Sequence, residues 1–124
     1  MAQDVSTARA GIVRIWRGRT VAARADAYER YLHDEGLPDL RKHALGVQML
    51  RQDRDGESDF VVMSFWPDIG AMSRFAGPDP RRIRHLAEDA DYLVELPDAV
   101  EIFEVKASTL PSPFARAYAP GDAS

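Results

Sequence analysis

The chain has 124 residues, of which 45% are hydrophobic and 29% charged, enough for one globular domain with a core that needs no covalent staples. It has no cysteine, which excludes disulfides and thiolate chemistry and fits a reducing compartment. The net charge of −4, the single short basic cluster and the lack of a long apolar run argue against nucleic-acid and membrane partners. We therefore expect a cytoplasmic protein.

The first strand is predicted at residues 11–18, where alternation puts Ile12, Arg14 and Trp16 on one face. A first helix should then run from Thr20, a favourable cap, to Gly36, a favourable end. Its buried row recurs at helical spacing: Val21, Ala25, Tyr28 and Leu32. Residues 37–43 are expected to form a loop or a short helical turn, because Pro38 prevents a continuous helix.

The most apolar run is residues 59–66, which we predict to be the central strand. A hairpin turn at Gly56 joins it to a strand at 46–52. One face carries Phe60, Val62, Ser64 and Trp66, and the other carries Val61, Met63 and Phe65. Because both faces are apolar, both must be covered in the folded protein.

Two further helices are predicted before the last strand. The first is capped by Asp68, ends at Gly77 and Pro78, and buries Ile69, Met72 and Phe75. The second starts at Asp79 and Pro80. Its apolar stripe consists of Ile83, Leu86, Ala87, Ala90 and Val94. The last strand is expected at 99–107, with flexible termini at 1–10 and 108–124.

The order β-α-β-β-α-β predicts an α+β domain over residues 11–107, a ferredoxin-like split β-α-β antiparallel sheet with helices on one face. The other face would be a large exposed apolar patch made of Val13, Ile15, Val61, Met63 and Phe65. We therefore expect a homodimer in which the two sheets face each other, forming a dimeric α+β barrel.

Several segments resemble the antibiotic biosynthesis monooxygenase superfamily: residues 12–18, 25–28, 65–68, 74–79 and 101–105. The resemblance implies a dimeric α+β barrel with a pocket in each subunit, between the sheet and the helices. The family includes cofactor-independent oxygenases of aromatic polyketides, haem-degrading monooxygenases and proteins with no established activity. A shared fold does not select among these functions.

The candidate pocket residues lie on the helix-side face. The expected substrate-binding residues are Trp16, Tyr28, Ser64, Trp66 and Phe75. Arg14 on the same face either pairs with a carboxylate such as Glu101 or Glu104, or holds a bound anionic group. The two tryptophans form either a flat wall for an aromatic ligand or plain core, which the sequence does not distinguish.

Two histidines are candidate acid/base residues. His33 has Glu29 one turn earlier, which suits a surface pair or a unit facing the pocket. His85 falls where the haem-degrading relatives place the histidine that binds iron. However, helical periodicity places His85 on the solvent side, and Trp16 stands where those relatives carry an asparagine. No metal-ligand spacing or nucleotide-binding motif is present, so zinc, flavin and nicotinamide are not expected.

The leading hypothesis is a cofactor-independent monooxygenase, an oxidoreductase acting on a hydrophobic aromatic phenol, quinol or polyketide. In the mechanism that the resemblance implies, the substrate's own carbanion would reduce oxygen. Arg14 would hold the oxyanion, Trp16 and Trp66 would sandwich the ring, and His33 or His85 would act as the base. One alternative is haem binding or degradation through His85. The other is a dimeric binding or stress-response module without enzymatic activity.

Overall fold

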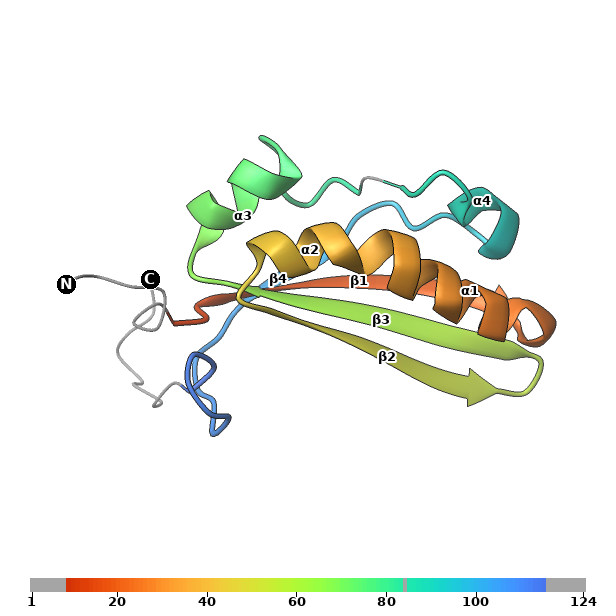
Figure 1. The fold of residues 1–124 in the computed structure, drawn as a ribbon, viewed down its shortest axis with the longest axis horizontal. Helices are drawn as coiled ribbons and strands as arrows, with labels where there is room; N and C mark the ends of the chain where they lie inside the picture. The colour runs from red at the N-terminus through yellow and green to blue at the C-terminus, as the bar shows by residue number, and fades with distance from the viewer. Residues whose placement is uncertain (1–8, 84, 116–124) are drawn as a thin grey trace.

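The sheet has the expected antiparallel α+β arrangement. A computed structural model describes residues 9–83 and 85–115. Within them, the strands are β1 (Ile12–Val21), β2 (Gly46–Arg54), β3 (Glu57–Trp66) and β4 (Glu101–Glu104), in the order β2-β3-β1-β4. Each neighbouring pair is antiparallel, and the helices cover one face (Figure 1). The predicted α+β class, with an antiparallel sheet and helices on one face, is confirmed.

The central strand β3 alternates as its sequence predicts. Its even-numbered residues, Ser58, Phe60, Val62, Ser64 and Trp66, are buried, whereas the residues between them are half-buried. Gly56 adopts a φ of 79° in the hairpin turn between β2 and β3, a conformation that favours glycine. The predicted hairpin and the two faces of the strand are therefore confirmed.

The segment from β1 to β2, residues 22–43, is here called the first crossover. It has a 3-10 turn (Ala22–Arg24), α1 (Ala25–Tyr31), a π-helical turn (Leu32–Gly36) and α2 (Leu37–His43). The predicted cap at Thr20 is wrong because Thr20 lies inside β1, where it pairs with Ser58. The predicted end at Gly36 is also wrong. Gly36 keeps helical dihedrals, and Pro38 falls in the first turn of α2, where a backbone N–H is dispensable.

Tyr28 stands at the centre of the core between the first crossover and the sheet. It is fully buried, with ring centroids 5.3 Å from Phe60, 5.2 Å from Tyr92 and 6.5 Å from Trp16. Edge-to-face and tilted contacts at these distances add about 0.5–1.5 kcal/mol per pair beyond burial. Ala25 and Leu32 are buried beside it, so most of the predicted helical row is confirmed, whereas Val21 is exposed.

The segment from β3 to β4, residues 67–100, is here called the second crossover. Its first helix, α3 (Ile69–Ala76), starts where predicted, since the Asp68 carboxylate accepts the Ala71 N–H at 2.8 Å. It ends at Gly77, which has a φ of 98°. Ile69 is 43% exposed, so its place in the predicted buried row is wrong. Met72 is buried as predicted, Phe75 is half-buried, and Ala76 is buried as well.

The helix predicted to start at Asp79 and Pro80 is wrong. Apart from α4 (Asp89–Tyr92), the described residues 77–100 lie in turns and isolated bridges. The bridges explain the extended path, because β4 pairs only with residues 12–15 of β1 and leaves the rest of that edge open. Leu93 bridges to Thr20, and the Val94 N–H donates to the Arg19 carbonyl at 2.9 Å. This segment therefore satisfies backbone groups that a helix would leave unpaired.

The opposite sheet face is partly covered by the C-terminal segment, which runs beneath the sheet (Figure 1). The Phe114 ring packs against Phe65 at 5.2 Å, and the Ala10 N–H donates to the Pro113 carbonyl at 2.9 Å. A Cβ on Gly46 would lie 2.5 Å from the Phe114 ring. Residues 10, 113 and 114 therefore pack on the domain, which corrects the expectation of flexible ends there; residues 1–8 and 116–124 lie outside the described residues.

The predicted patch on this face is less exposed than expected. Val13 is buried, and the other four predicted members, Ile15, Val61, Met63 and Phe65, are half-buried. Phe103 and Leu50, which share the face by register, remain 50% and 47% exposed. As for membrane insertion, the described residues include no helix with the length and apolar character to cross a bilayer.

Candidate functional site

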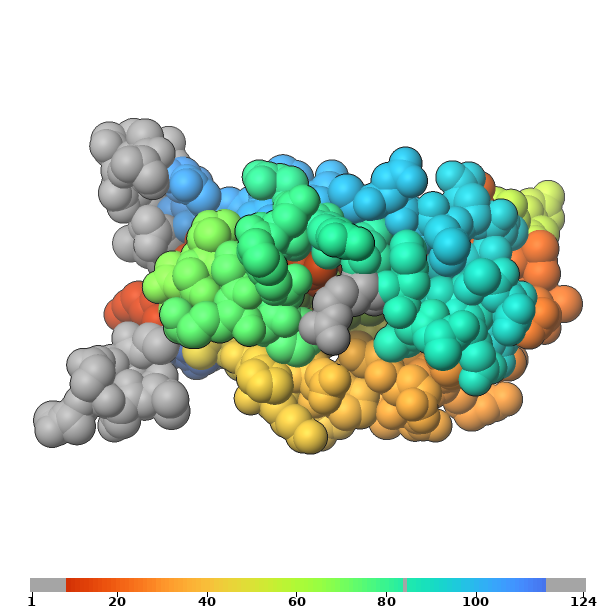
Figure 2. Space-filling view, turned by 90° about the horizontal axis from the view of Figure 1, so that it is seen from above, coloured from red at the N-terminus to blue at the C-terminus, as the bar shows by residue number. Residues whose placement is uncertain are grey.

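A pocket of about 200 Å³ lies on the helix side of the sheet, between the two crossovers. Its floor comes from β1 and β3, and its walls come from α2, the end of α3 and the irregular part of the second crossover. In Figure 2, which looks down on the helix side, part of β1 shows in red in a gap beside α3. The resemblance placed a pocket between the sheet and the helices, which is where this one lies.

The register between β1 and β3 decides which side chains form the floor of the pocket. Arg14 pairs with Ser64 and Trp16 pairs with Val62 across β1 and β3, so all four side chains project to the helix side and line the pocket. Phe75, from the last turn of α3, lines it as well. Of the expected substrate-binding residues, the structure therefore brings Trp16, Ser64 and Phe75 together.

Trp66 and Tyr28 are held away from the pocket. The Trp66 indole is buried, donates from Nε1 to Ser64 Oγ at 2.9 Å and packs against Phe75, with ring centroids 5.5 Å apart. The expected sandwich between two tryptophans is therefore not formed, and the aromatic rings that line the pocket beside Trp16 include Phe75 but not Trp66. Tyr28 is buried in the aromatic core and does not line the pocket. It contacts the pocket residue Asp89 through a hydrogen bond.

Arg14 fastens the second crossover to the sheet. Its Nε donates to the Pro80 carbonyl at 3.1 Å, and its Nη2 donates to the Arg82 carbonyl at 3.3 Å. Of the two carboxylates expected as partners, Glu101 lies on the opposite face, where it pairs with Arg17 at 2.7 Å, and Glu104 pairs with Lys106 at 2.8 Å. Since Arg14 also lines the pocket, its guanidinium both anchors the 80–82 loop and contributes a positive charge to the pocket.

Asp89 is the site residue that the sequence interpretation missed. Its carboxylate is 2% exposed and lines the pocket. Oδ1 accepts the Tyr28 hydroxyl at 2.9 Å, and Oδ2 accepts the Leu86 N–H at 2.9 Å. Burial, and then the neighbouring Asp89 charge, raise the pKa of Tyr28, so the phenol keeps its proton and acts as a donor. Nothing in the acidic run 88–91 distinguishes this carboxylate from its exposed neighbours.

The two histidines are placed differently from one another. His85 is exposed and lines the pocket, so it stands at the rim; it lies outside any helix, which removes the periodicity argument made for it. His33 is on the surface, where it contacts Asp34 at 3.0 Å, whereas Glu29, its expected partner, pairs with Arg51. Only His85 of the two candidate bases therefore reaches the pocket.

The pocket does not fit a haem. Its volume of about 200 Å³ is below the roughly 300–1,000 Å³ of pockets that enclose drug-sized ligands, and a haem is larger than most such ligands. Within residues 9–83 and 85–115, no group of three or more histidine, cysteine or carboxylate side chains is placed to hold a metal ion.

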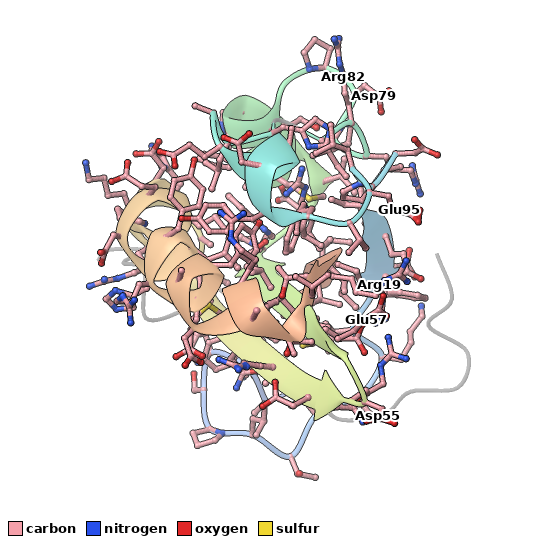
Figure 3. The ribbon with its side chains drawn as sticks, turned by 90° about the vertical axis from the view of Figure 1, so that its right-hand side faces the viewer. Arg19, Asp55, Glu57, Asp79, Arg82 and Glu95 are labelled. Carbon is pink, nitrogen blue, oxygen red and sulfur yellow. The ribbon has the colours of Figure 1, made fainter. Side chains whose placement is uncertain are left out.

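A larger hollow, of about 500 Å³, lies over the outer ends of β1, β2 and β3. It is lined by charged groups that pair within the fold. Arg19 lies between Glu57 and Glu95, at 3.3 Å from each (Figure 3), and Asp59 accepts from Arg54 at 2.6 Å. Because these charges already have partners, we regard the helix-side pocket as the candidate site.

The fold and the pocket define a small α+β protein with a cavity of about 200 Å³ between its sheet and helices. The chain is similar to a crystal structure described as a "putative antibiotic biosynthesis monooxygenase" from Bacillus cereus, with a TM-score of 0.58 and 14% sequence identity. The match covers 82% of this chain and 99% of that chain. No family model and no curated protein matches the sequence. The predicted resemblance is thus confirmed for the fold, and at this identity it shows the fold alone.

Proposed function

We propose that the chain is a monooxygenase-like oxidoreductase that acts on a small hydrophobic aromatic molecule in the helix-side pocket. The observation that carries the proposal is the pocket's lining. Two aromatic side chains, Trp16 and Phe75, stand with a few polar groups, Arg14, Ser64 and Asp89, in a cavity between sheet and helices. Ligand pockets combine apolar walls with a small number of orienting polar groups in this way. The fold similarity to a protein described as a monooxygenase supports the reaction class.

The size of the pocket favours a compact substrate. A volume of about 200 Å³ suits one or two fused rings better than an extended polyketide. We therefore narrow the substrate class to small phenols, naphthols and quinols.

In the proposed reaction the substrate supplies all the electrons. The substrate binds as the neutral phenol and then loses its hydroxyl proton to the base, which leaves an anion with carbanion character at a ring CH. This carbon combines with O₂ and a proton to give a hydroperoxide, and loss of water turns the ring CH into a carbonyl, so that one oxygen atom is retained and the other leaves as water. The protein's contribution is to hold the ring, exclude water and accept the proton. His85 is the expected base that lies at the pocket, and the Arg14 cation is placed to stabilise an oxyanion on the substrate.

The test is ligand binding combined with oxygen uptake. We expect 1-naphthol to raise the melting temperature of the wild type, and this rise to be largely lost in Phe75→Ala, which removes a pocket wall. The matched control is Ile69→Ala, since Ile69 is exposed on the same helix, α3, and does not line the pocket. An oxygen electrode then surveys a panel of phenols and hydroquinones. If the ligands stabilise the protein but no oxygen is consumed, the protein is a non-enzymatic binding module and not an enzyme. If no phenol or hydroquinone of the panel stabilises the protein, the pocket is not a ligand site.

We also propose that the protein is a homodimer formed through the sheet face opposite the pocket. The support is that Phe103 and Leu50 are exposed there beside the half-buried Met63 and Ile15. Sedimentation at micromolar concentration should give a dimer, and Met63→Asp should dissociate it, because an unpaired charge would be buried in the interface. A wild-type monomer under these conditions would contradict the proposal.

A further inference from the structure

We propose that Asp89 is the ligand-recognition residue of the helix-side pocket, and that it selects neutral aromatic ligands bearing a hydroxyl group over the corresponding anions. The inference rests on the proposed function, because it takes this pocket as the ligand site. It goes further by naming the recognising atoms and the ionisation state of the ligand that binds.

The Asp89 carboxylate is held in place by two donors. The Tyr28 hydroxyl bonds to Oδ1 and the Leu86 N–H bonds to Oδ2, both at 2.9 Å. Tyr28 is itself fixed by the aromatic core, and Leu86 belongs to the segment that closes the pocket. Because this carboxylate is already held in place, it loses little conformational freedom when a ligand binds, which favours binding.

The same carboxylate retains acceptor capacity toward the pocket. Two carboxylate oxygens offer about four acceptor positions, of which the Tyr28 and Leu86 donors occupy one on each oxygen. Asp89 is 2% exposed and is one of the residues that line the cavity. A ligand hydroxyl entering the pocket would therefore donate a charge-assisted hydrogen bond to it, which is stronger than a bond between neutral groups.

The charges around the pocket favour a neutral ligand. Among the described residues, the titratable side chains that line it are three carboxylates, one guanidinium and one imidazole: Glu35, Asp39, Asp89, Arg14 and His85. Arg14 directs its Nε and Nη2 donors to backbone carbonyls of the second crossover. An anion bound against Asp89 would experience like-charge repulsion in a poorly solvated place, whereas the neutral hydroxyl form would not.

The probe for the test is 4-nitrophenol, whose phenolate absorbs visible light and whose neutral phenol does not. Its ionisation is titrated free in solution and in the presence of saturating protein, and binding is followed separately by equilibrium dialysis. If Asp89 selects the neutral form tenfold or more, the ionisation midpoint of the bound dye lies at least one pH unit above that of the free dye.

Two variants assign this shift to Asp89. In Asp89→Asn most of the shift should disappear, so that the ionisation midpoint of the bound dye approaches that of the free dye, because the substitution removes the charge at nearly constant size. Asp91→Asn is the matched control: Asp91 is an exposed carboxylate on the same helix, α4, and does not line the pocket, so the midpoint should stay within a few tenths of a pH unit of the wild type. If Asp89→Asn does not fold, Tyr28→Phe serves instead. It frees an acceptor position on the carboxylate, so the midpoint should move to still higher pH.

The outcomes separate the two proposals. If the wild type binds no dye, the pocket is not a site for phenols, and both the proposed function and this inference are rejected. If the dye binds but its midpoint is unshifted or lowered, or if Asp89→Asn keeps the full shift, the inference is overturned while the pocket stands. If Tyr28→Phe, used in place of an unfolded Asp89→Asn, leaves the midpoint unchanged, the inference is likewise overturned.

Discussion

The two crossovers cover the same face of one sheet in different ways. The first crossover is helical over nearly its whole length, from Ala22 to His43. The second is helical only in α3 and α4, and its described residues between them lie in turns or irregular backbone. The regular crossover supplies the buried aromatic core, whereas the irregular one supplies His85 and Asp89 to the pocket. The difference follows a general division of labour, in which regular elements provide stability and loops carry functional groups.

The irregular crossover is held by polar contacts rather than by a helical stripe. Arg14 bonds to the carbonyls of Pro80 and Arg82, Tyr28 bonds to Asp89, and the Val94 N–H bonds to β1. These contacts connect the sheet and the first crossover to the pocket wall formed by the second crossover, although that wall has no continuous helix. Substitutions in the two crossovers should therefore have distinguishable effects, which the following predictions rank by size.

The largest effect is expected from Tyr28→Ala in the first crossover. It removes a fully buried ring from the aromatic cluster, which typically costs about 3–5 kcal/mol, and leaves Asp89 without one of its donors. Tyr28→Phe keeps the ring and should cost only about 1–3 kcal/mol, for the hydroxyl alone. Urea unfolding measures both. Equal losses in the two variants would contradict the role given to the aromatic packing.

Arg14→Met should loosen the second crossover and leave the first intact. We expect a loss of about 2–3 kcal/mol, because the guanidinium makes two hydrogen bonds to carbonyls of the 80–82 loop. Trypsin cleavage after Arg81 or Arg82 should also become faster. The matched control is Arg17→Met on the same strand, whose exposed ion pair with Glu101 should contribute about 1 kcal/mol or less. Unchanged cleavage in Arg14→Met would show that Arg14 does not hold the loop.

Gly77→Ala tests the end of α3 through the backbone alone. Gly77 has φ 98° and ψ 179°, a region open essentially only to glycine, and an added Cβ would meet no atom within 4 Å. The expected cost is about 1–2 kcal/mol, measured by chemical denaturation. Gly70→Ala, in the first turn of α3, should have an effect of less than about 1 kcal/mol, because the added Cβ favours the helix but lies 3.3 Å from Oδ1 of the capping Asp68. If both substitutions stabilise the protein, the turn after α3 does not require glycine.

The smallest effect concerns Thr20, where β1 passes into the first crossover. Its side chain is fully buried, and its Oγ1 has no hydrogen-bond partner among the described residues. Thr20→Val keeps the shape and removes the unpaired hydroxyl, so stability should rise by about 1 kcal/mol. Thr20→Ser keeps the hydroxyl and removes a methyl group, and should lose about 0.8 kcal/mol. A lower melting temperature for Thr20→Val would mean that the hydroxyl is satisfied in solution.

The strands were predictable from the sequence because alternation is a local property. Phe60, Val62 and Trp66 are buried on one face of β3, as their spacing indicates. The crossovers were less predictable because tertiary pairing decided them. The sequence at Gly36 predicts a helix end, but the chain continues there through a π-helical turn. Asp79 and Pro80 predict a helix start, but the segment that follows pairs with β1 and with residues 99 and 100, just before β4.

The residues of the site were predictable only where they lie on strands. Arg14, Trp16 and Ser64 share the pocket because period-two alternation and register place them there. Asp89 was missed because its burial depends on Tyr28, a residue 61 positions away along the chain. His85 reached the pocket for a related reason, since its position depends on the irregular path of the second crossover.

The central claim, that the helix-side pocket is the ligand site, can be tested directly with the two tryptophan indole N–H signals in a ¹H–¹⁵N spectrum. The Trp16→Phe variant assigns them. On titration with 1-naphthol, the Trp16 signal should shift and saturate, because Trp16 lines the pocket. The Trp66 signal, whose N–H is bonded to Ser64, should shift less. Saturable binding that leaves the Trp16 signal unmoved would contradict the account.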